Sequence, residues 1–102
     1  MFNLTKLDNQ LGRRLRLIQI RRTLKHPDRL RIVNLLKEEG DMYLGDIFMN
    51  LHIGQRHGKR QIAALKNAGI VQVHDSRKHG INQKVQKELH QVMDDLVKKA
   101  SA

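Results

Sequence analysis

The chain has 102 residues, which predicts a single domain. It has 20 Lys and Arg against 10 Asp and Glu, so its formal net charge is +10. This charge predicts a polyanionic partner but does not distinguish DNA, RNA and an anionic membrane surface. The chain has no cysteine, which excludes disulfides, thiolate metal sites and a cysteine nucleophile. No apolar run is long enough for a transmembrane helix and the first residues lack the pattern of a signal peptide, so we expect a cytoplasmic protein with no membrane partner.

A long first helix is predicted over about residues 3–24. Apolar residues recur there at steps of three and four, namely Leu4, Leu7, Leu11, Leu15 and Ile18, while arginines fill the opposite face. One short chain offers little core, so we expect part of this apolar surface to face a second subunit. The alternative is that the helix covers the core of its own chain.

Three further helices are predicted over about 27–39, 43–51 and 55–67. Pro27 suits the first turn of the first of them, and Gly40 suits a left-handed cap at its end. A tight break at His52-Ile53-Gly54 separates the other two. Two helices joined by a short turn form a helix-turn-helix.

The segment 55–67 concentrates basic and amide side chains in its first turns: Gln55, Arg56, His57, Lys59 and Arg60. In a helix-turn-helix such residues reach base edges in the major groove, where Gln recognises adenine and Arg guanine, while Lys contacts phosphate. The alternative is a solvated basic face without base contacts. Gly58 stays ambiguous, because it could permit close approach of the preceding helix or of a phosphate, or leave the first turn frayed.

The pattern changes to a period of two after this helix, where Val71 and Val73 alternate with polar residues and predict a strand. The polar segment DSRKHG is predicted to turn at Gly80, and residues 81–85 to return as the partner strand. Arg77, Lys78 and His79 would then lie at the tip of the hairpin, in contact with the DNA backbone or the minor groove; the alternative is an ordinary polar turn. A last helix is predicted over about 84–99.

Two motifs resemble the arsenic-repressor (ArsR) family. The first consists of Pro27, Arg29, Leu30 and Ile32, and the second of Leu65, Ala68, Gly69, Ile70 and Val71. The similarity covers about residues 20–85 and implies a mainly α winged helix-turn-helix, in the order α-α-α-α-β-β-α, over a single domain 1–102. It also implies that the first and last helices dimerise. The candidate dimer residues are Leu4, Leu7, Leu11, Leu89, Val92 and Leu96, and the alternative for each is a place in its own subunit's core.

The sequence departs from this family at its metal sites. Tyr43, Gly45, Asp46 and Ile47 stand where metal-sensing members carry a Cys-x-Cys pattern and an Asp-Leu pair. His79 and His90 have the spacing of the family's zinc-binding histidines, but His79 falls in the predicted hairpin and Arg77 replaces the aspartate. His90 and Asp94 lie four apart on one helical face, and two ligands do not make a closed site, so we interpret them as a solvated pair. No metal and no cofactor are expected.

These features predict a transcriptional regulator that binds double-stranded DNA sequence-specifically as a homodimer on an inverted repeat, with repression the usual mode of the resembled family. An enzyme is not expected, because Ser76 and Ser101 have no organised base and the adjacent Asp94 and Asp95 point to different helical sides. The alternative is a nucleic-acid binder without sequence preference, or a protein-interaction module. The chain has only three aromatic residues. Recognition of single-stranded RNA usually relies on aromatic side chains that stack on bases, so this scarcity weighs against it.

Overall fold

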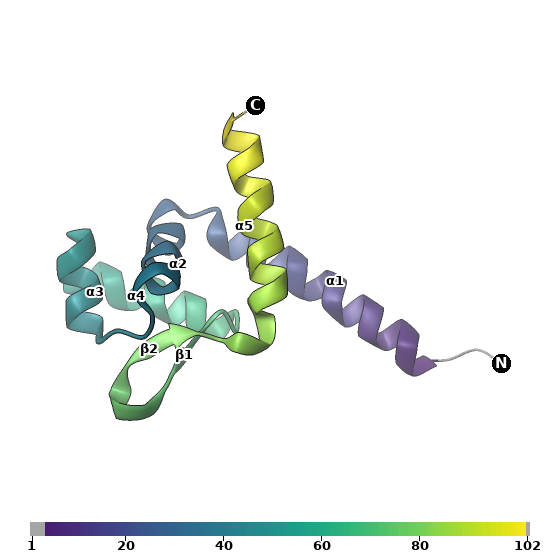
Figure 1. The fold of residues 1–102 in the computed structure, drawn as a ribbon, viewed down its shortest axis with the longest axis horizontal. Coiled ribbons are helices and arrows are strands. Elements are labelled where there is room, and N and C mark those ends of the chain that lie inside the picture. The colour runs from purple at the N-terminus through teal and green to yellow at the C-terminus, as the bar shows by residue number, and fades with distance from the viewer. Residues whose placement is uncertain (1–3, 102) are drawn as a thin grey trace.

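The computed structural model describes residues 4–101, and their side chains over residues 10–99. Four helices precede a two-stranded antiparallel hairpin, and a fifth helix follows it (Figure 1). The elements are α1 (Leu4–Leu24), α2 (Pro27–Glu39), α3 (Leu44–Leu51), α4 (Gln55–Asn67), β1 (Val71–Val73), η1 (Asp75–Arg77), β2 (His79–Ile81), η2 (Gln83–Val85) and α5 (Gln86–Ser101). The predicted fold class and element order are confirmed.

The helix-turn-helix is bounded by local backbone signals. Pro27 occupies the first turn of α2, and Gly40 ends that helix with φ of 80°. His52 ends α3 in the left-handed conformation, with φ of 55° and ψ of 45°, and Gly54 precedes α4. The sequence therefore predicts α2 and α4 with their observed bounds, and α3 to within one residue.

The hairpin is shorter than predicted. Val71 pairs with Ile81, Gln72 with Gly80 and Val73 with His79, so Gly80 lies inside β2 and is not the turn residue. Residues 83–85 form the short helix η2, not a strand. Met42 forms an isolated bridge with His79, which ties the segment between α2 and α3 to the hairpin. A Cβ on Gly80 would meet the Asp41 carboxylate, so a larger residue there would require that side chain to shift.

A single aliphatic core joins the helices and the base of the hairpin. Its fully buried side chains are Ile20, Leu24, Ile32, Leu36, Ile47, Leu65, Ile70, Leu89, Val33, Val71 and Val92. The core therefore draws on α5 as well as on the helix-turn-helix, so α5 belongs to the body of the chain.

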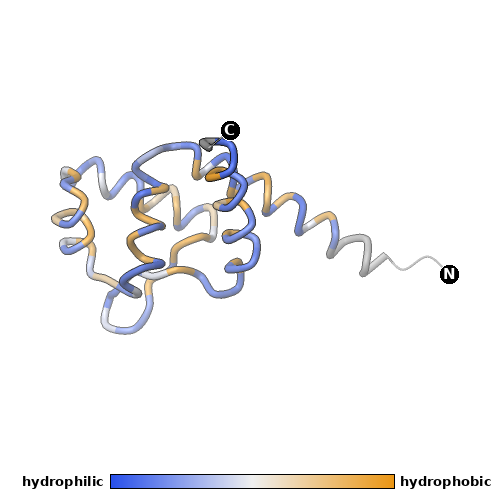
Figure 2. Tube along the Cα trace, turned by 45° about the horizontal axis from the view of Figure 1, so that its top comes forward, coloured by the Kyte–Doolittle hydropathy of each residue, from blue (hydrophilic) through white to orange (hydrophobic). Residues whose placement is uncertain are grey.

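Helix α1 extends away from that body (Figure 1). The radius of gyration is 15.0 Å, whereas a compact domain of 100 residues has about 13 Å. Figure 2 shows hydrophobic residues continuing along the projecting part of α1. The chain therefore leaves an apolar helix face uncovered.

Candidate nucleic-acid interface

Helix α4 presents one polar face and one buried face. Gln55, Arg56, Lys59 and Arg60 are all exposed, and their spacing of one, four and five residues places them on one side of a helix with 3.6 residues per turn. Gly58, Gln61, Ile62 and Leu65 are buried on the other side. Burial of Ile62 and Leu65 anchors α4 in the body, so the basic side chains are held outward.

The exposed face of α4 makes no side-chain hydrogen bond or ion pair with the described part of the chain. Among the described side chains, no hydrogen bond or ion pair engages Gln55, Arg56, Lys59 or Arg60. The helix begins after Gly54 without a side-chain cap and has no acid in its first turn. Its first backbone N–H groups and its three cations are therefore available to an anion, and phosphate is the anion that a helix N-terminus favours.

His57 lies apart from this group, on the side of α4 that turns toward α2. Its Nε2 is 2.8 Å from Asp28 Oδ2, and its ring centroid is 6.0 Å from that of His26. The hydrogen bond from His57, followed by that from Arg31, holds the pKa of Asp28 below its usual range. His57 thus joins α4 to α2 in this structure.

Gly58 marks the closest approach of α3 and α4. A Cβ at this position would lie 2.5 Å from Phe48 Cε1 and 2.7 Å from Phe48 Cδ1. Of the roles that the sequence left open for Gly58, close approach of the preceding helix is the one observed. The absence of a side chain at Gly58 lets the Phe48 ring pack directly against the α4 backbone.

Two arginines that sequence reasoning gave no structural role hold the helix-turn-helix together. Arg29 Nε donates to Gln61 Oε1 at 2.7 Å, and Gln61 is only 6% exposed. Arg31 donates to the Leu51 carbonyl oxygen at 2.6 Å, at the end of α3, and to Asp28 Oδ1 at 3.1 Å. A polar Gln61 on the apolar face of α4 was the sequence signal that could have revealed the first contact.

The structure separates the three predicted tip residues of the hairpin. Arg77 is exposed at the tip, where Ser76 and Arg77 both have φ of 65°. Lys78 Nζ lies 5.3 Å from the centre of the Tyr43 ring. The placement of His79 at the tip is wrong: it pairs in β2, is 7% exposed, and has a buried Nδ1 with no partner among the described residues. Burial, and then the charge of Lys66, lower the pKa of His79.

The predicted dimer residues fall into three groups. Leu4 and Leu7 lie outside the residues whose side chains are described. Leu11 is 55% exposed on the projecting part of α1. Leu89 and Val92 are 1% and 0% exposed in the core of their own chain, and Leu96 packs partly buried against that core. These three α5 residues therefore pack in or against the core of their own chain, which was the alternative to a dimer contact, because α5 completes that core.

The structure also bears on metal and membrane sites. Among the described side chains, no group of three or more His, Cys, Asp or Glu could hold a metal ion. His90 Nε2 lies 3.4 Å from Asp94 Oδ2, with 66% and 58% of the two side chains exposed. Within residues 4–101, no helix is both long enough and apolar enough to cross a bilayer.

A family model described as "Bacterial regulatory protein, arsR family" matches residues 26–73. The fold is similar to the transcriptional repressor BigR from Xylella fastidiosa, with a TM-score of 0.64 and 23% identity over 90% of this chain and 88% of that chain. It is also similar to a MarR family protein from Bacillus stearothermophilus, with a TM-score of 0.61 and 18% identity over 99% and 81% of the two chains. RV1404 from Mycobacterium tuberculosis gives a TM-score of 0.62 and 12% identity over 99% and 78%.

At these identities the solved structures show a shared fold alone. Curated protein sequences give no significant match. The resemblance to the ArsR family is confirmed by the family match, and so is the prediction that the chain is not an enzyme, since that family consists of regulatory proteins. The chain is therefore a DNA-binding transcriptional regulator with a winged helix-turn-helix fold, and its residues 26–73 match the arsR family.

Proposed function

We propose that this regulator acts as a homodimer that reads an inverted-repeat operator in double-stranded DNA and represses transcription from it. The observation that carries this proposal is the exposed face of α4, whose polar side chains have no partner within the described part of the chain. In a helix-turn-helix the second helix enters the major groove with its N-terminal residues on the base edges. Helix α4 is that second helix here.

The four side chains of this face suit different parts of the DNA. Arg56 and Arg60 can each donate two hydrogen bonds to guanine, and Gln55 can bond adenine in the same bidentate manner. Lys59 is a point charge that suits a phosphate and carries little sequence information. His57 would have to leave Asp28 before it could contact a base, so we assign it a secondary role.

The hairpin supplies a second contact in this proposal. Arg77 is exposed at its tip, and Lys78 is held beside Tyr43. Both can approach the phosphate backbone or minor groove next to the site of α4. His79 is excluded from this contact because it is buried at the base of the hairpin.

The proposed dimer rests on α1. Leu11, Leu15 and Ile18 are 55%, 58% and 45% exposed, and their steps of four and three place them in one stripe. A contiguous exposed apolar patch is typical of a protein interface. A symmetric dimer through α1 would present two α4 helices about one helical turn apart on the duplex, which is the arrangement that reads an inverted repeat.

Repression follows from occupancy alone. A dimer on its operator blocks access to the DNA that it covers, whereas activation needs an additional contact with the transcription machinery. Repression is therefore the simpler mode, and we place this action in the cytoplasm.

The test is selection of bound sequences from a random duplex pool at roughly physiological salt. We expect an enriched inverted repeat. Arg56→Ala and Arg60→Ala should each weaken binding to it by about 1–3 kcal/mol and relax specificity at one position of each half-site. Lys59→Ala should weaken binding to all sequences alike and reduce the salt dependence by about one phosphate contact.

Lys98→Ala is a matched control, since it removes one positive charge at the far end of α5 (Figure 1). It should leave the selected repeat and the affinity nearly unchanged. Binding without enrichment, with a steep fall as salt rises, would contradict the proposal and reduce the interaction to backbone attraction.

A further inference from the structure

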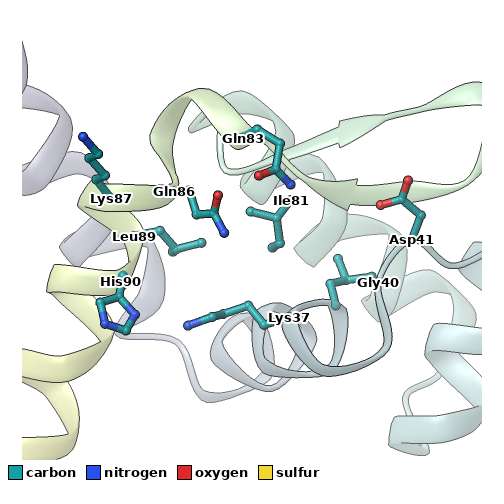
Figure 3. Close-up of a pocket in the computed structure, with 10 residues that line it drawn as sticks. Lys37, Gly40, Asp41, Ile81, Gln83, Gln86, Lys87, Leu89 and His90 are labelled. Atoms are coloured by element: carbon teal, nitrogen blue, oxygen red, sulfur yellow. The ribbon is translucent and has the colours of Figure 1, made fainter.

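A cavity of about 580 Å³ lies on the body of the chain (Figure 3). It is formed where the end of α2, strand β2 and the first turns of α5 meet, and no residue of α4 lines it. Leu36, Ile81 and Leu89 form its apolar floor and are 2%, 8% and 1% exposed. Its volume lies in the range of about 300–1,000 Å³ that is usual for sites of small molecules.

The polar groups of the cavity come from both sides. Figure 3 shows the amine of Lys37, on α2, extended toward His90 on α5, with the amide of Gln86 on the same side as the floor residues Leu89 and Ile81. The Lys37 amine, the His90 ring and the Gln86 amide each offer an N–H donor. An oxygen-bearing group placed between α2 and α5 would therefore meet donors from two elements.

The cavity carries an excess of positive charge. Asp41 is the one acid among its lining residues, and its Oδ2 lies 2.7 Å from His74 Nδ1. Figure 3 shows the Asp41 carboxylate directed away from Lys37 and His90. His90 Nε2 lies 3.4 Å from Asp94 Oδ2, so the ring can donate to a ligand from its other nitrogen only when both ring nitrogens carry a proton. A cationic ligand is disfavoured beside Lys37, and an anion is favoured.

We propose that this cavity binds a small amphiphilic carboxylate. Its carboxylate would lie between Lys37 and His90, and its hydrocarbon part would cover Leu36, Ile81 and Leu89. A purely inorganic anion would bring no apolar area to bury against the floor, whose side chains are already at most 8% exposed, whereas a neutral hydrocarbon would leave the Lys37 amine without a partner. One molecule with both parts satisfies both surfaces, because burial of apolar area and a charge-assisted hydrogen bond then add.

Titration of octanoate into the isotope-labelled full chain, followed by NMR, tests this site. We expect saturable binding with chemical-shift changes centred on Leu36, Ile81 and Leu89. Lys37→Met should weaken octanoate binding about tenfold or more, because it removes a charge-assisted contact while keeping an apolar stem of similar length. Octanamide, which has the same chain without the charge, should bind the unchanged protein about tenfold more weakly for the same reason.

Lys98→Met is the control, because it makes the same change of charge and side chain in the last turn of α5, away from the cavity lining, and it should bind octanoate like the unchanged chain. Equal affinity for octanoate and octanamide, or an unchanged affinity in Lys37→Met, would overturn the proposal. Shift changes confined to the exposed stripe of α1 would also overturn it, because they would indicate general adsorption. The titration contains no DNA, so its failure would leave the proposed operator binding untouched, and the reverse also holds.

Discussion

In α4, the apolar side chains of Ile62 and Leu65 are 3% and 0% exposed, whereas in α1 those of Leu11 and Leu15 are 55% and 58% exposed. Both helices combine apolar residues at helical spacing with several basic residues. The body of the chain covers the apolar face of α4 and leaves an apolar face of α1 bare. Helical periodicity thus reports that a face can be buried, and the rest of the fold decides whether it is.

Helix α1 has two apolar faces, which explains its partial burial. Ile20 and Leu24 are 1% exposed in the core of the chain, near the end of α1. Ion pairs on that part of α1 reach α5, from Arg16 to Glu88 at 3.6 Å and from Arg21 to Asp95 at 3.3 Å. Leu11 lies on the second face, on the part of α1 that projects beyond the body, and a second copy of the chain is the partner that we propose for this face.

The largest effect is expected from a substitution that disrupts this proposed dimer contact. Leu15→Glu places a charge in the centre of the α1 stripe, and in a symmetric dimer the change occurs twice. We expect dimerisation to weaken by about 3 kcal/mol or more, which is over a hundredfold in the dimer dissociation constant. Sedimentation equilibrium over a range of protein concentrations measures this constant directly.

Arg13→Gln is the matched control, since it also lowers the charge of α1 by one but lies beside Gln91 of α5. It should leave the dimer constant within about threefold, a difference of about 0.7 kcal/mol. A Leu15→Glu variant that still dimerises as well as the unchanged chain would show that the exposed face of α1 is not the dimer surface.

A smaller effect is expected where α4 is fastened to α2. Arg29→Met removes the 2.7 Å hydrogen bond to Gln61 and leaves the buried amide of Gln61 without that donor. The expected loss in the free energy of unfolding is about 2 kcal/mol, measured by urea denaturation. This change would loosen the helix whose apolar face is fully covered.

The pairing itself is tested by adding Gln61→Met to Arg29→Met. Removal of both polar partners should cost less than the sum of the single changes, by about 1 kcal/mol or more of coupling. Additive losses would mean that Arg29 and Gln61 stabilise the chain independently, and the contact would then not explain the position of α4.

Two glycines, one on a buried and one on an open helix surface, allow a comparison with a smaller expected effect. A Cβ at Gly58 would lie within 2.8 Å of three Phe48 ring carbons, whereas a Cβ at Gly45 would meet nothing within 4 Å. We expect Gly58→Ala to destabilise the chain by about 1 kcal/mol, because overpacking outweighs the gain in helix propensity. Gly45→Ala should stabilise it by about 0.5 kcal/mol. The melting temperatures of both variants measure this difference. A Gly58→Ala variant that is more stable than the unchanged chain would show that the Phe48 ring moves aside without cost.

The helix bounds could be predicted from sequence because their signals are local. Pro27 at the start of α2, and Gly54 and Gly69 on either side of α4, act within one or two residues of the positions that they mark. The exposed residues of α4 were likewise predictable, since the apolar positions of Ile62 and Leu65 fix which side of the helix faces solvent.

The wrong predictions concern contacts between residues far apart in the chain. Gly80 resembles a turn residue in sequence, but it pairs with Gln72 inside β2. Leu11 and Leu89 have the same periodic pattern, and only the packing of α5 against the body buries one of them. The cavity beside Lys37 also lies between distant segments, so no local motif announces it.

The smallest expected effect lies at the start of α4, where His57 bonds Asp28. That bond, with the one from Arg31, lowers the pKa of Asp28 from 3.8. The folded chain then binds fewer protons than the unfolded chain in this range, so the contribution of Asp28 is present above pH 3.8 and is lost as the pH falls through its lowered pKa. At neutral pH the melting temperature of Asp28→Asn should therefore lie below that of the unchanged chain. This difference should shrink on acidification to below the lowered pKa of Asp28.

His57→Ala removes the larger of the two causes and keeps the carboxylate. It should reproduce more of the Asp28→Asn effect than removal of the Arg31 contact does, for example by Arg31→Met. If instead the acid dependence of melting were the same in His57→Ala as in the unchanged chain, the bond from α4 to α2 would have no energetic role. The attachment of α4 to the body would then depend only on its buried apolar face and on the hydrogen bond of Gln61. Helices α1 and α4 would then differ only in whether the body buries their apolar residues.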